Sequence, residues 1–528
     1  MTSTPRYAHA AVAAPHNLAS QAGRDILAEG GSAIEAMIAM AATIAVVYPH
    51  MNAIGGDGFW LVREPGGKVH YIEACGYAGA GATIERYRKL GYDAIPARGP
   101  EAAVTIPGAI GGWNLAHEMA QAFGGRLPMT DILHAAIKLA RDGYPQSPSE
   151  AGGAPKEFAN LIAAPGFADA FLVDGKLPAA GVLRKAERLA ATLEHLAHDG
   201  LDDFYRGDIG REMAADMDKL GTPLTRADLE KFRALLRQPL SVRVRDATCF
   251  NSAPPTQGLA SLLILGIFDK LGVKKRDSFE HIHGLIEATK RAFLIRDRVC
   301  TDYDFLEQDP ASFLQPERLA REAGAISMSR AAPWPAPPGE GDTVWMGAID
   351  SKGLAVSYIQ SIYWEYGSGC VLPKTGVLLQ NRGTSFSLDP KARNPLAPGR
   401  RPFHTLNPAM SVYDDGRVMV YGSMGGDGQP QFQAQVLTRW EMGMGLAEAV
   451  DAPRFLLGRT WGEVETALRM EDRFDPTLLR NLEKAGHAVV VDAPYSETLG
   501  HAGGVVRYRD GRLDAAHDPR SDGGAAGL

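Results

Sequence analysis

The chain is short of cysteine, a residue that marks many secreted and metal-binding domains. It has four cysteines in 528 residues, and no two of them form a Cys-x-x-Cys pair. This scarcity argues against a disulfide framework and against a cysteine-ligated zinc cluster. The four residues are Cys75, Cys249, Cys300 and Cys370. We therefore expect reduced cysteines and a cytoplasmic location.

Long apolar runs and a strong charge of one sign are also missing. The most apolar stretch, residues 33–48, contains Glu35 and is shorter than the roughly 20 residues that a membrane-spanning helix needs. The first residues lack a basic start followed by an apolar run and a small-residue cleavage site, so no secretory signal is expected. The formal net charge of −7 gives no general attraction for nucleic acid or anionic membranes. We expect a soluble protein with neither as a partner.

Hydrophobic residues make up 45% of the chain and charged residues 22%, as in ordinary globular proteins. Apolar periodicity and capping residues, Ser32 and Thr130 among them, predict helices at 18–28, 33–47, 130–141, 183–197, 226–236 and 281–296. Residues 144–319 are expected to be mainly helical. Runs of β-branched and aromatic residues predict strands at 59–63, 68–72, 343–349, 354–361, 410–413 and 418–422. The last four strands are expected to form two hairpins.

A Pro-rich segment divides the chain. Residues 331–342 contain four prolines and two glycines, which form neither a helix nor a central strand. We expect an exposed connector that ends at Asp342. Thr343 follows as the first residue of a predicted strand.

A threonine in this place can be a nucleophile. A hydroxyl attacks an amide only when a base removes its proton, and the residue's own α-amino group supplies that base once the preceding peptide bond is cut. The reference pKa of an α-amino group, about 8, leaves an appreciable neutral fraction at neutral pH. Most threonines at strand starts are simply good β-formers, so the junction of Asp342 and Thr343 predicts self-cleavage only together with other features.

Ordered motifs on both sides of the junction are those features. The first part of the chain has GGDGF at 55–59, PG at 107–108, GW at 112–113 and LARDG at 139–143. The second part has YGSG at 366–369, TGVLLQN at 375–381, RP at 401–402, NP at 407–408, GSMGG at 422–426, DAPRF at 451–455 and DPRS at 518–521. In this order, and over almost the whole chain, they resemble the γ-glutamyltranspeptidase family.

The resemblance implies an α+β protein with the four-layer αββα sandwich of N-terminal-nucleophile hydrolases. Self-cleavage would give a large fragment, residues 1–342, and a small fragment, residues 343–528. The two would form an obligate heterodimer, and a dimer of such pairs, (αβ)2, stays open.

Catalytic roles carry over position by position. Thr343 falls on the family's nucleophile, and Ser361 on a second hydroxyl that hydrogen-bonds the nucleophile. Gly425 and Gly426 fall on the glycines whose N–H groups form the oxyanion hole, although a plain turn would also explain two adjacent glycines. No cofactor is implied, since the threonine supplies nucleophile and base.

The chain departs from the family where the substrate amino acid is gripped. Cys75 stands in place of the arginine that holds the substrate α-carboxylate, and Ser385 in place of the aspartate that holds its ammonium. Tyr363 replaces an asparagine and Arg382 a glutamine. Two consecutive serines become His404 and Thr405.

These replacements predict a different substrate. Without the aspartate an ammonium would be buried unpaired, which is costly, whereas Arg382 offers a forked donor for a carboxylate. Tyr363 and Trp364 favour a small acyl group. The sequence therefore predicts hydrolysis of a small amide that carries a carboxylate but no amino group, such as oxamate. A structural ion pair of Arg382 with Glu365 or Asp389 is the alternative for that arginine.

Two other functions remain open. The chain could be a γ-glutamyltransferase or glutathione hydrolase whose clamp is built from other residues, or a binding relative that no longer processes itself. A metal site is not expected. His281 and His283 are two residues apart in a predicted helix, where such side chains point apart.

Overall fold

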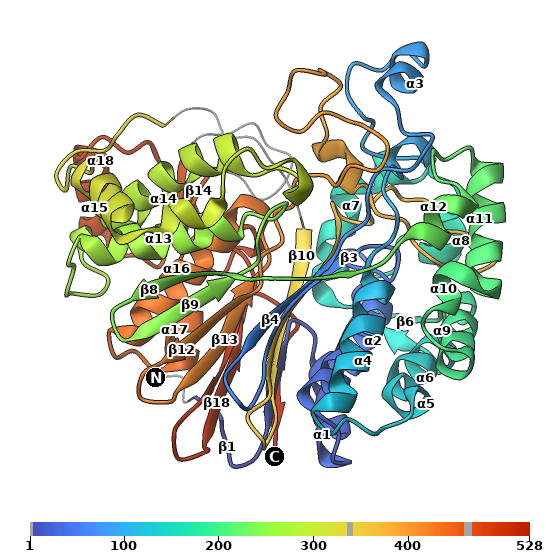
Figure 1. Cartoon of the computed structure of the whole chain (residues 1–528), viewed down its shortest axis with the longest axis horizontal. Helices are drawn as coiled ribbons and strands as arrows, with labels where there is room; N and C mark the ends of the chain where they lie inside the picture. The colour runs from blue at the N-terminus through green and yellow to red at the C-terminus, as the bar shows by residue number, and fades with distance from the viewer. Residues whose placement is uncertain (1–3, 335–341, 459–466) are drawn as a thin grey trace.

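The computed structural model of the chain describes residues 4–334, 342–458 and 467–528. Two antiparallel sheets pack face to face, and each has a layer of helices on its outer side (Figure 1). This is the predicted four-layer αββα sandwich. In the described part of the chain each of the two sheets has seven strands.

Strands from both sides of residue 342 are mixed within each sheet. The first sheet has the order β1-β18-β17-β13-β12-β9-β8, and the second has the order β19-β2-β10-β11-β3-β4-β7. The first sheet is built from β1 (Arg6–Tyr7), β8 (Leu240–Val244), β9 (Ala247–Asn251), β12 (Ala409–Tyr413), β13 (Val418–Ser423), β17 (Ala502–Arg507) and β18 (Leu513–His517). The second is built from β2 (Ala11–Ala14), β3 (Asp57–Arg63), β4 (Val69–Ala74), β7 (Leu235–Arg237), β10 (Asp342–Ile349), β11 (Ala355–Tyr363) and β19 (Gly524–Gly527).

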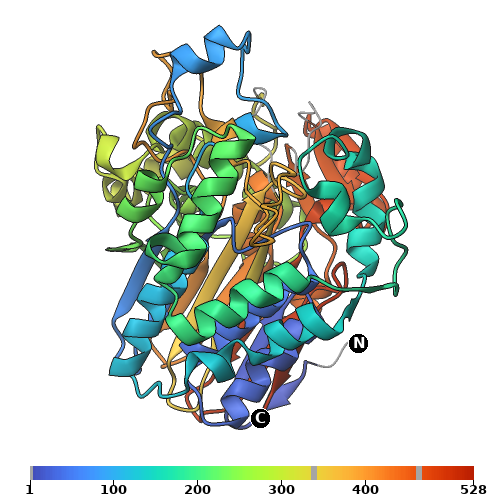
Figure 2. The ribbon, with the colours of Figure 1, turned by 90° about the vertical axis from the view of Figure 1, so that its right-hand side faces the viewer.

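The second sheet is covered by helices of residues 17–199 (Figure 2). Three of them contact the sheet: α1 (Asn17–Ala28), α2 (Ala33–Val47) and α4 (Ala109–Ala122). Outside these, α6 (His134–Asp142) packs on α2, and α9 (Glu187–Asp199) packs on α6. The Ser32 side chain accepts a hydrogen bond from Glu35 N–H, and Glu35 accepts one from Ser32 N–H, so the predicted cap at Ser32 is confirmed and is part of a capping box. Every residue of α2 is buried, which explains why it is apolar on all sides.

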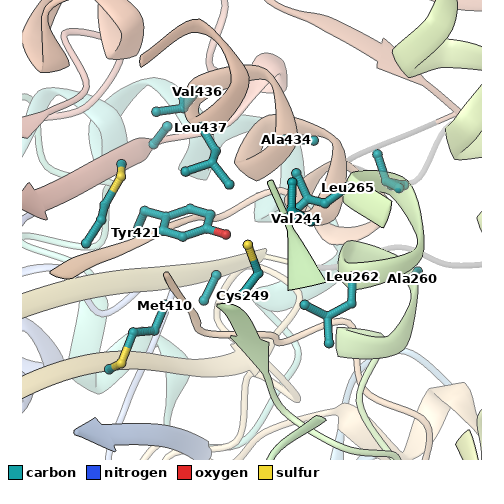
Figure 3. Packing of buried hydrophobic residues seen from close by; sticks show 14 of the residues in the cluster. Val244, Cys249, Ala260, Leu262, Leu265, Met410, Tyr421, Ala434, Val436 and Leu437 are labelled. Carbon is teal, nitrogen blue, oxygen red and sulfur yellow. The ribbon is translucent and has the colours of Figure 1, made fainter. Parts of the chain in front are cut away.

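The first sheet is covered by α13 (Gly258–Lys270), α14 (Phe279–Val299), α15 (Pro316–Gly324) and α16 (Gln429–Glu441). Side chains of the strands and of α13 and α16 interlock between these layers (Figure 3). Cys249 and Tyr421 of the strands lie there with Leu262 of α13 and Leu437 of α16. This core fixes the start of α16 against the end of β13.

Both predicted hairpins are confirmed, but several predicted helices are wrong in part. The helix expected at 130–141 is two, α5 (Met129–Ile132) and α6, and Thr130 lies inside α5 instead of capping it. The helix expected at 183–197 begins only at Glu187, because Leu183–Arg184 form β6 against β5 (Tyr144–Pro145). These pairings depend on distant partners, which a local pattern does not contain.

The region expected to be mainly helical also contains strands. The helix predicted at 226–236 ends at Lys231 as α12 (Arg226–Lys231), and β7 follows as an edge strand on β4. β8 and β9 form a hairpin that completes the first sheet. Residues alternate between buried and exposed along β8, so its Leu-Ser-Val-Arg-Val pattern had the strand period of two.

Other expectations concern single residues. All four cysteines are buried and free, as predicted. Among the described residues no helix is both long and apolar enough to cross a membrane. Positions 335–341 of the predicted connector lie outside the described residues. Of its described positions, Ala332 and Pro333 are exposed.

Candidate active site

Thr343 lies near the start of β10, between the two sheets. The β10–β11 ladder pairs Asp342 with Tyr363 and Val344 with Gln360, and a bulge between them contains Thr343. Val344 packs with the helices over the second sheet, whereas Trp345 packs between the sheets. Because side chains alternate along a strand, Thr343 faces the first sheet with Trp345, and it is fully buried.

Trp345 shows how closely the sheets approach beside Thr343. Its Nε1 donates to Ser357 Oγ at 2.9 Å. A Cβ added to Gly422 of β13 would lie 2.1 Å from the Trp345 ring, so only glycine fits there. The GSMGG motif thus begins with a glycine that sets the spacing of the sheets.

Ser361 and Asp57 continue the line of Thr343 across the sheet. The bulge leaves Thr343 opposite residues 361 and 362 of β11, and Ser361 pairs with Asp57 of β3. Ile359 and Phe59, two residues along their strands, pack between the sheets, so Ser361 and Asp57 face the same side. Ser361 Oγ accepts a hydrogen bond from Tyr363 N–H at 2.8 Å. The structure therefore places Ser361 beside Thr343 on the neighbouring strand, and Asp57 beside Ser361.

The two predicted oxyanion glycines lie in the turn between β13 and α16. Gly425 and Gly426 have φ values of 118° and 51°, which favour glycine. In the described part of the chain no acceptor is found for the N–H of either residue. Gln429, three residues later, donates from Nε2 to Thr343 Oγ1 at 3.1 Å. That bond places the turn and the positive end of α16 beside the hydroxyl.

The sequence analysis missed Gln429 and its neighbours. Four glutamines alternate along α16, and all are buried. Gln429 and Gln433 bond Asn407 at 3.1 and 2.6 Å. Gln431 and Gln435, on another face, bond the backbone of β14 (Phe455–Leu457). Repeated glutamines in an otherwise apolar helix were the available signal.

Arg382 lies at the start of η4 (Arg382–Ser385) and is buried close to β11. Its guanidinium carbon lies 3.6 Å from the centre of the Tyr363 ring, and Tyr363 pairs with Asp342. Its nitrogens donate to Thr405 Oγ1 at 3.3 Å and to Phe403 O at 3.4 Å. Asn407 donates to Thr405 O at 2.9 Å, so hydrogen bonds connect Arg382 with Gln429 and Thr343.

No ion pair neutralises Arg382 within the described residues, since no carboxylate oxygen lies within 4.0 Å of it. The predicted alternative, an ion pair with Glu365 or Asp389, is therefore not formed there. Burial lowers the pKa of Arg382 to about 10, against the opposing charges of Tyr363 and Asp57. The group stays cationic at neutral pH. We call Asp57, Tyr363, Arg382, His404 and Thr405 the arginine cluster.

His404 and Asp57 complete the arginine cluster. His404 Nε2 lies 3.5 Å from Asp57 Oδ2. Burial holds the pKa of His404 well below its usual range, assisted by the charges of Arg382 and Arg401, so its ring is neutral. Burial raises the pKa of Asp57 to about 7, although a hydrogen bond from Gly76 N–H opposes the shift.

Cys75 and Ser385, which were predicted to stand at the family's clamp positions, offer no charge at neutral pH. Burial raises the pKa of Cys75 well above its usual value, so it is a thiol. Ser385 Oγ donates to Arg382 O at 3.1 Å and to Phe403 O at 3.0 Å. Ser385 therefore supports the backbone around Arg382.

One group of possible metal ligands lies away from this site. His283, Glu287 and His487 have ligand atoms within 4.8 Å of one another. Lys290 Nζ donates to Glu287 at 2.7 Å, and the two imidazoles are hydrogen-bonded at 2.9 Å. An ammonium beside the carboxylate opposes a cation. His281 bonds Thr438 instead, so the two histidines of α14 do point apart.

Comparison with known proteins gives the family. Residues 19–528 match the family model described as gamma-glutamyltranspeptidase. The chain is 50% identical to the oxamate amidohydrolase proenzyme of Klebsiella pneumoniae, over 98% of each chain. The chain belongs to the γ-glutamyltranspeptidase family. It is also 37% identical to a glutathione hydrolase-like proenzyme of Bacillus subtilis, again over 98% of each chain.

Solved structures of this family agree with the fold. A cephalosporin acylase from Bacillus halodurans superposes with a TM-score of 0.91 at 32% identity, covering 100% of this chain and 97% of that one. As a γ-glutamyltranspeptidase family member, the chain is an amide hydrolase with the N-terminal-nucleophile fold. The predicted family, fold and enzyme class are confirmed.

Proposed function

We propose that the chain is a self-processing amide hydrolase, with Thr343 as its nucleophile, that acts on a small amide bearing a carboxylate, such as oxamate. The buried guanidinium of Arg382, which has no ion pair among the described residues and is connected to Thr343 by hydrogen bonds, is the observation that carries the substrate class. The 50% identity to an oxamate amidohydrolase proenzyme supports it.

Processing begins with Thr343 Oγ1 and the carbonyl carbon of Asp342. Attack by the hydroxyl converts the peptide bond into an ester and releases the α-amino group of Thr343. Water then hydrolyses the ester, which leaves fragments 1–342 and 343–528. Because both sheets mix strands from the two fragments, neither fragment can bury its sheets alone. The two fragments therefore form an obligate heterodimer. A dimer of such heterodimers is compatible with this proposal.

Turnover uses the amino group that processing released. It takes the proton of Thr343 Oγ1 as the oxygen attacks the substrate carbonyl, while Gln429 Nε2 orients that oxygen. The N–H groups of Gly425 and Gly426 hold the oxyanion, and each such donor is worth about 3 kcal/mol. The ammonium returns its proton to the leaving nitrogen, ammonia departs, and water hydrolyses the acyl ester. Ser361 supports Thr343 from the neighbouring strand.

The arginine cluster selects the acyl group. A carboxylate that binds Arg382 neutralises a buried cation and gains charge-assisted hydrogen bonds. Thr405 holds one guanidinium nitrogen and Tyr363 stacks on its face, which fixes the fork. With Ser385 uncharged, nothing at that position pairs with a substrate ammonium. His404 adds a neutral ring beside the guanidinium.

A panel of amides tests this function. Ammonia or aniline release is measured for oxamate, glutaryl anilide and γ-glutamyl anilide, the last two differing only in the amino group. We expect the acids without an amino group to be preferred. A preference for γ-glutamyl anilide would instead establish a γ-glutamyl enzyme with a rebuilt clamp. A single full-length band on a denaturing gel, with no turnover, would indicate the non-processing relative.

A further inference from the structure

Unsatisfied polar groups meet in the arginine cluster. Within the described residues Asp57 Oδ2 and both ring nitrogens of His404 have no hydrogen-bond partner. Arg382 has no carboxylate within 4.0 Å there. All three side chains are at most 1% exposed. Buried polar groups are nearly always paired, so this arrangement indicates a polar ligand.

Asp57 is placed to take part in binding that ligand. It lies on β3 opposite Ser361, on the face that carries Thr343. Gly76 N–H donates to its Oδ1 at 3.0 Å, which fixes the carboxyl group while leaving Oδ2 available. A Cβ on Gly56, the residue before it, would lie 2.1 Å from Ser361 O. Glycine at position 56 therefore allows β3 to lie close to β11 beside Asp57.

The charges around Asp57 show what a bound anion would do. Besides hydrogen bonds from Gly76, Gly108 and Gln380, which favour the charged form of Asp57, titratable groups lie around it. They are Arg382 of η4, His404 before β12, Cys75 after β4, Tyr358 of β11 and Tyr205 of α10 (Asp203–Arg206). Arg382 alone among these is charged at neutral pH. A second carboxylate would give two anions beside one cation, and carboxylates that share such a site retain a proton between them.

We infer that Asp57 takes up a proton from solvent when a substrate carboxylate binds Arg382. The protonated Asp57 then donates a hydrogen bond from Oδ2 to the substrate carboxylate. One proton moves from water to Asp57, and no bond in the substrate changes. This inference rests on the proposed function, because it needs an anionic acyl group.

Because binding takes up a proton, the affinity for an anionic amide depends on pH. Burial places the pKa of Asp57 near 7 in the free enzyme, and the bound anion raises it further. Below that pH the carboxyl is already protonated and binding is insensitive to pH. Above that pH, kcat/KM for anionic amides should fall about tenfold for each pH unit, because KM rises. For a neutral amide of the same size, kcat/KM should not show this fall.

Calorimetry with oxalate as the probe tests the inference on the processed enzyme. Binding is measured at pH about 8 in two buffers of different ionisation enthalpy, which gives the number of protons taken up. The wild type is compared with Asp57→Asn, which keeps an oxygen for Gly76 N–H but cannot titrate. We expect the wild type to take up about one proton more than Asp57→Asn. The Thr343 amino group contributes equally to both.

The outcomes separate this inference from the proposed function. Oxalate binding with equal proton uptake by both proteins overturns the role of Asp57 and leaves Arg382 as anchor. Absence of oxalate binding in the wild type overturns the proposed function as well. If Asp57→Asn does not fold or process, infrared difference spectra of the wild type decide. A carboxylic acid C=O band that appears with oxalate supports the inference, and its absence overturns it.

Discussion

Thr343 and Arg382 lie at the two ends of one chain of hydrogen bonds but are held by different kinds of structure. Thr343 belongs to the β10–β11 ladder. Arg382, His404 and Thr405 come instead from η4 and from the loop before β12, although Asp57 and Tyr363 of the arginine cluster lie in β3 and β11. Loop residues can change without disturbing a ladder. The fold therefore constrains the proposed nucleophile more than the proposed carboxylate anchor.

The largest effect on activity is expected from the substitution of Thr343. Thr343→Ala removes the hydroxyl that starts both processing and turnover, so the protein should remain one chain and be inactive. A denaturing gel and an ammonia assay measure this. The wild type should give fragments of roughly 37 and 20 kDa, if its 56.6 kDa divides in proportion to length. An uncut, fully active wild type would contradict the mechanism.

The second largest effect is expected for substitutions in the turn that contains Gly425 and Gly426. Gly425 has a φ of 118°, which a β-branched residue adopts only with strain, so Gly425→Val should move the N–H groups. We expect kcat to fall about 10²-fold or more, as when one oxyanion donor is lost. Thermal unfolding of the same variant checks that it is folded. Normal turnover by a folded Gly425→Val would show that this turn does not hold the oxyanion.

Arg382 tests the other half of the site. Arg382→Met should lose about 2–4 kcal/mol of transition-state binding for anionic amides, and Arg382→Lys should lose less because it keeps the charge without the fork. kcat/KM for oxamate measures the loss, with a neutral amide of similar size as control. An equal loss for both substrates would mean that Arg382 supports the fold and does not bind the carboxylate.

Gln429 connects the two halves and should have a smaller effect. Gln429→Met keeps the length of the side chain but removes the donor to Thr343 Oγ1 and the acceptor for Asn407. We expect kcat to fall about tenfold with little change in KM, since one neutral hydrogen bond contributes about 1 kcal/mol. Gln433→Met, on the same face but without a bond to Thr343, is the matched control. Equal loss in both would assign the effect to packing of α16.

The smallest expected effect is a change of preference. Ser385→Asp restores a carboxylate at the position where the family holds the substrate ammonium. The ratio of γ-glutamyl anilide to glutaryl anilide hydrolysis should rise, by about tenfold at most, because Cys75 still replaces the family's arginine. No change in the ratio would place the acyl group elsewhere in the site.

Some features of the protein were determined by sequence alone. Ser32 and Glu35 start α2, and the turn at Gly353 fixes the β10–β11 hairpin, because caps and hairpins depend on neighbours along the chain. The order of motifs gave the family, and with it Thr343, Ser361 and the two glycines. Arg382 stood out because it replaced an uncharged residue.

Only the tertiary structure decided the rest. Asp57 and His404 are 347 positions apart, and nothing near either predicts their contact, which depends on the register of β3 with β11. The neutral state of His404 follows from burial, which is a property of the packed layers. The packing of η4 also decides that no carboxylate of the described residues lies within 4.0 Å of Arg382. β7 was missed for the same reason, because an edge strand of three residues is defined by the strand beside it. β8, in contrast, carried a period of two in its own sequence.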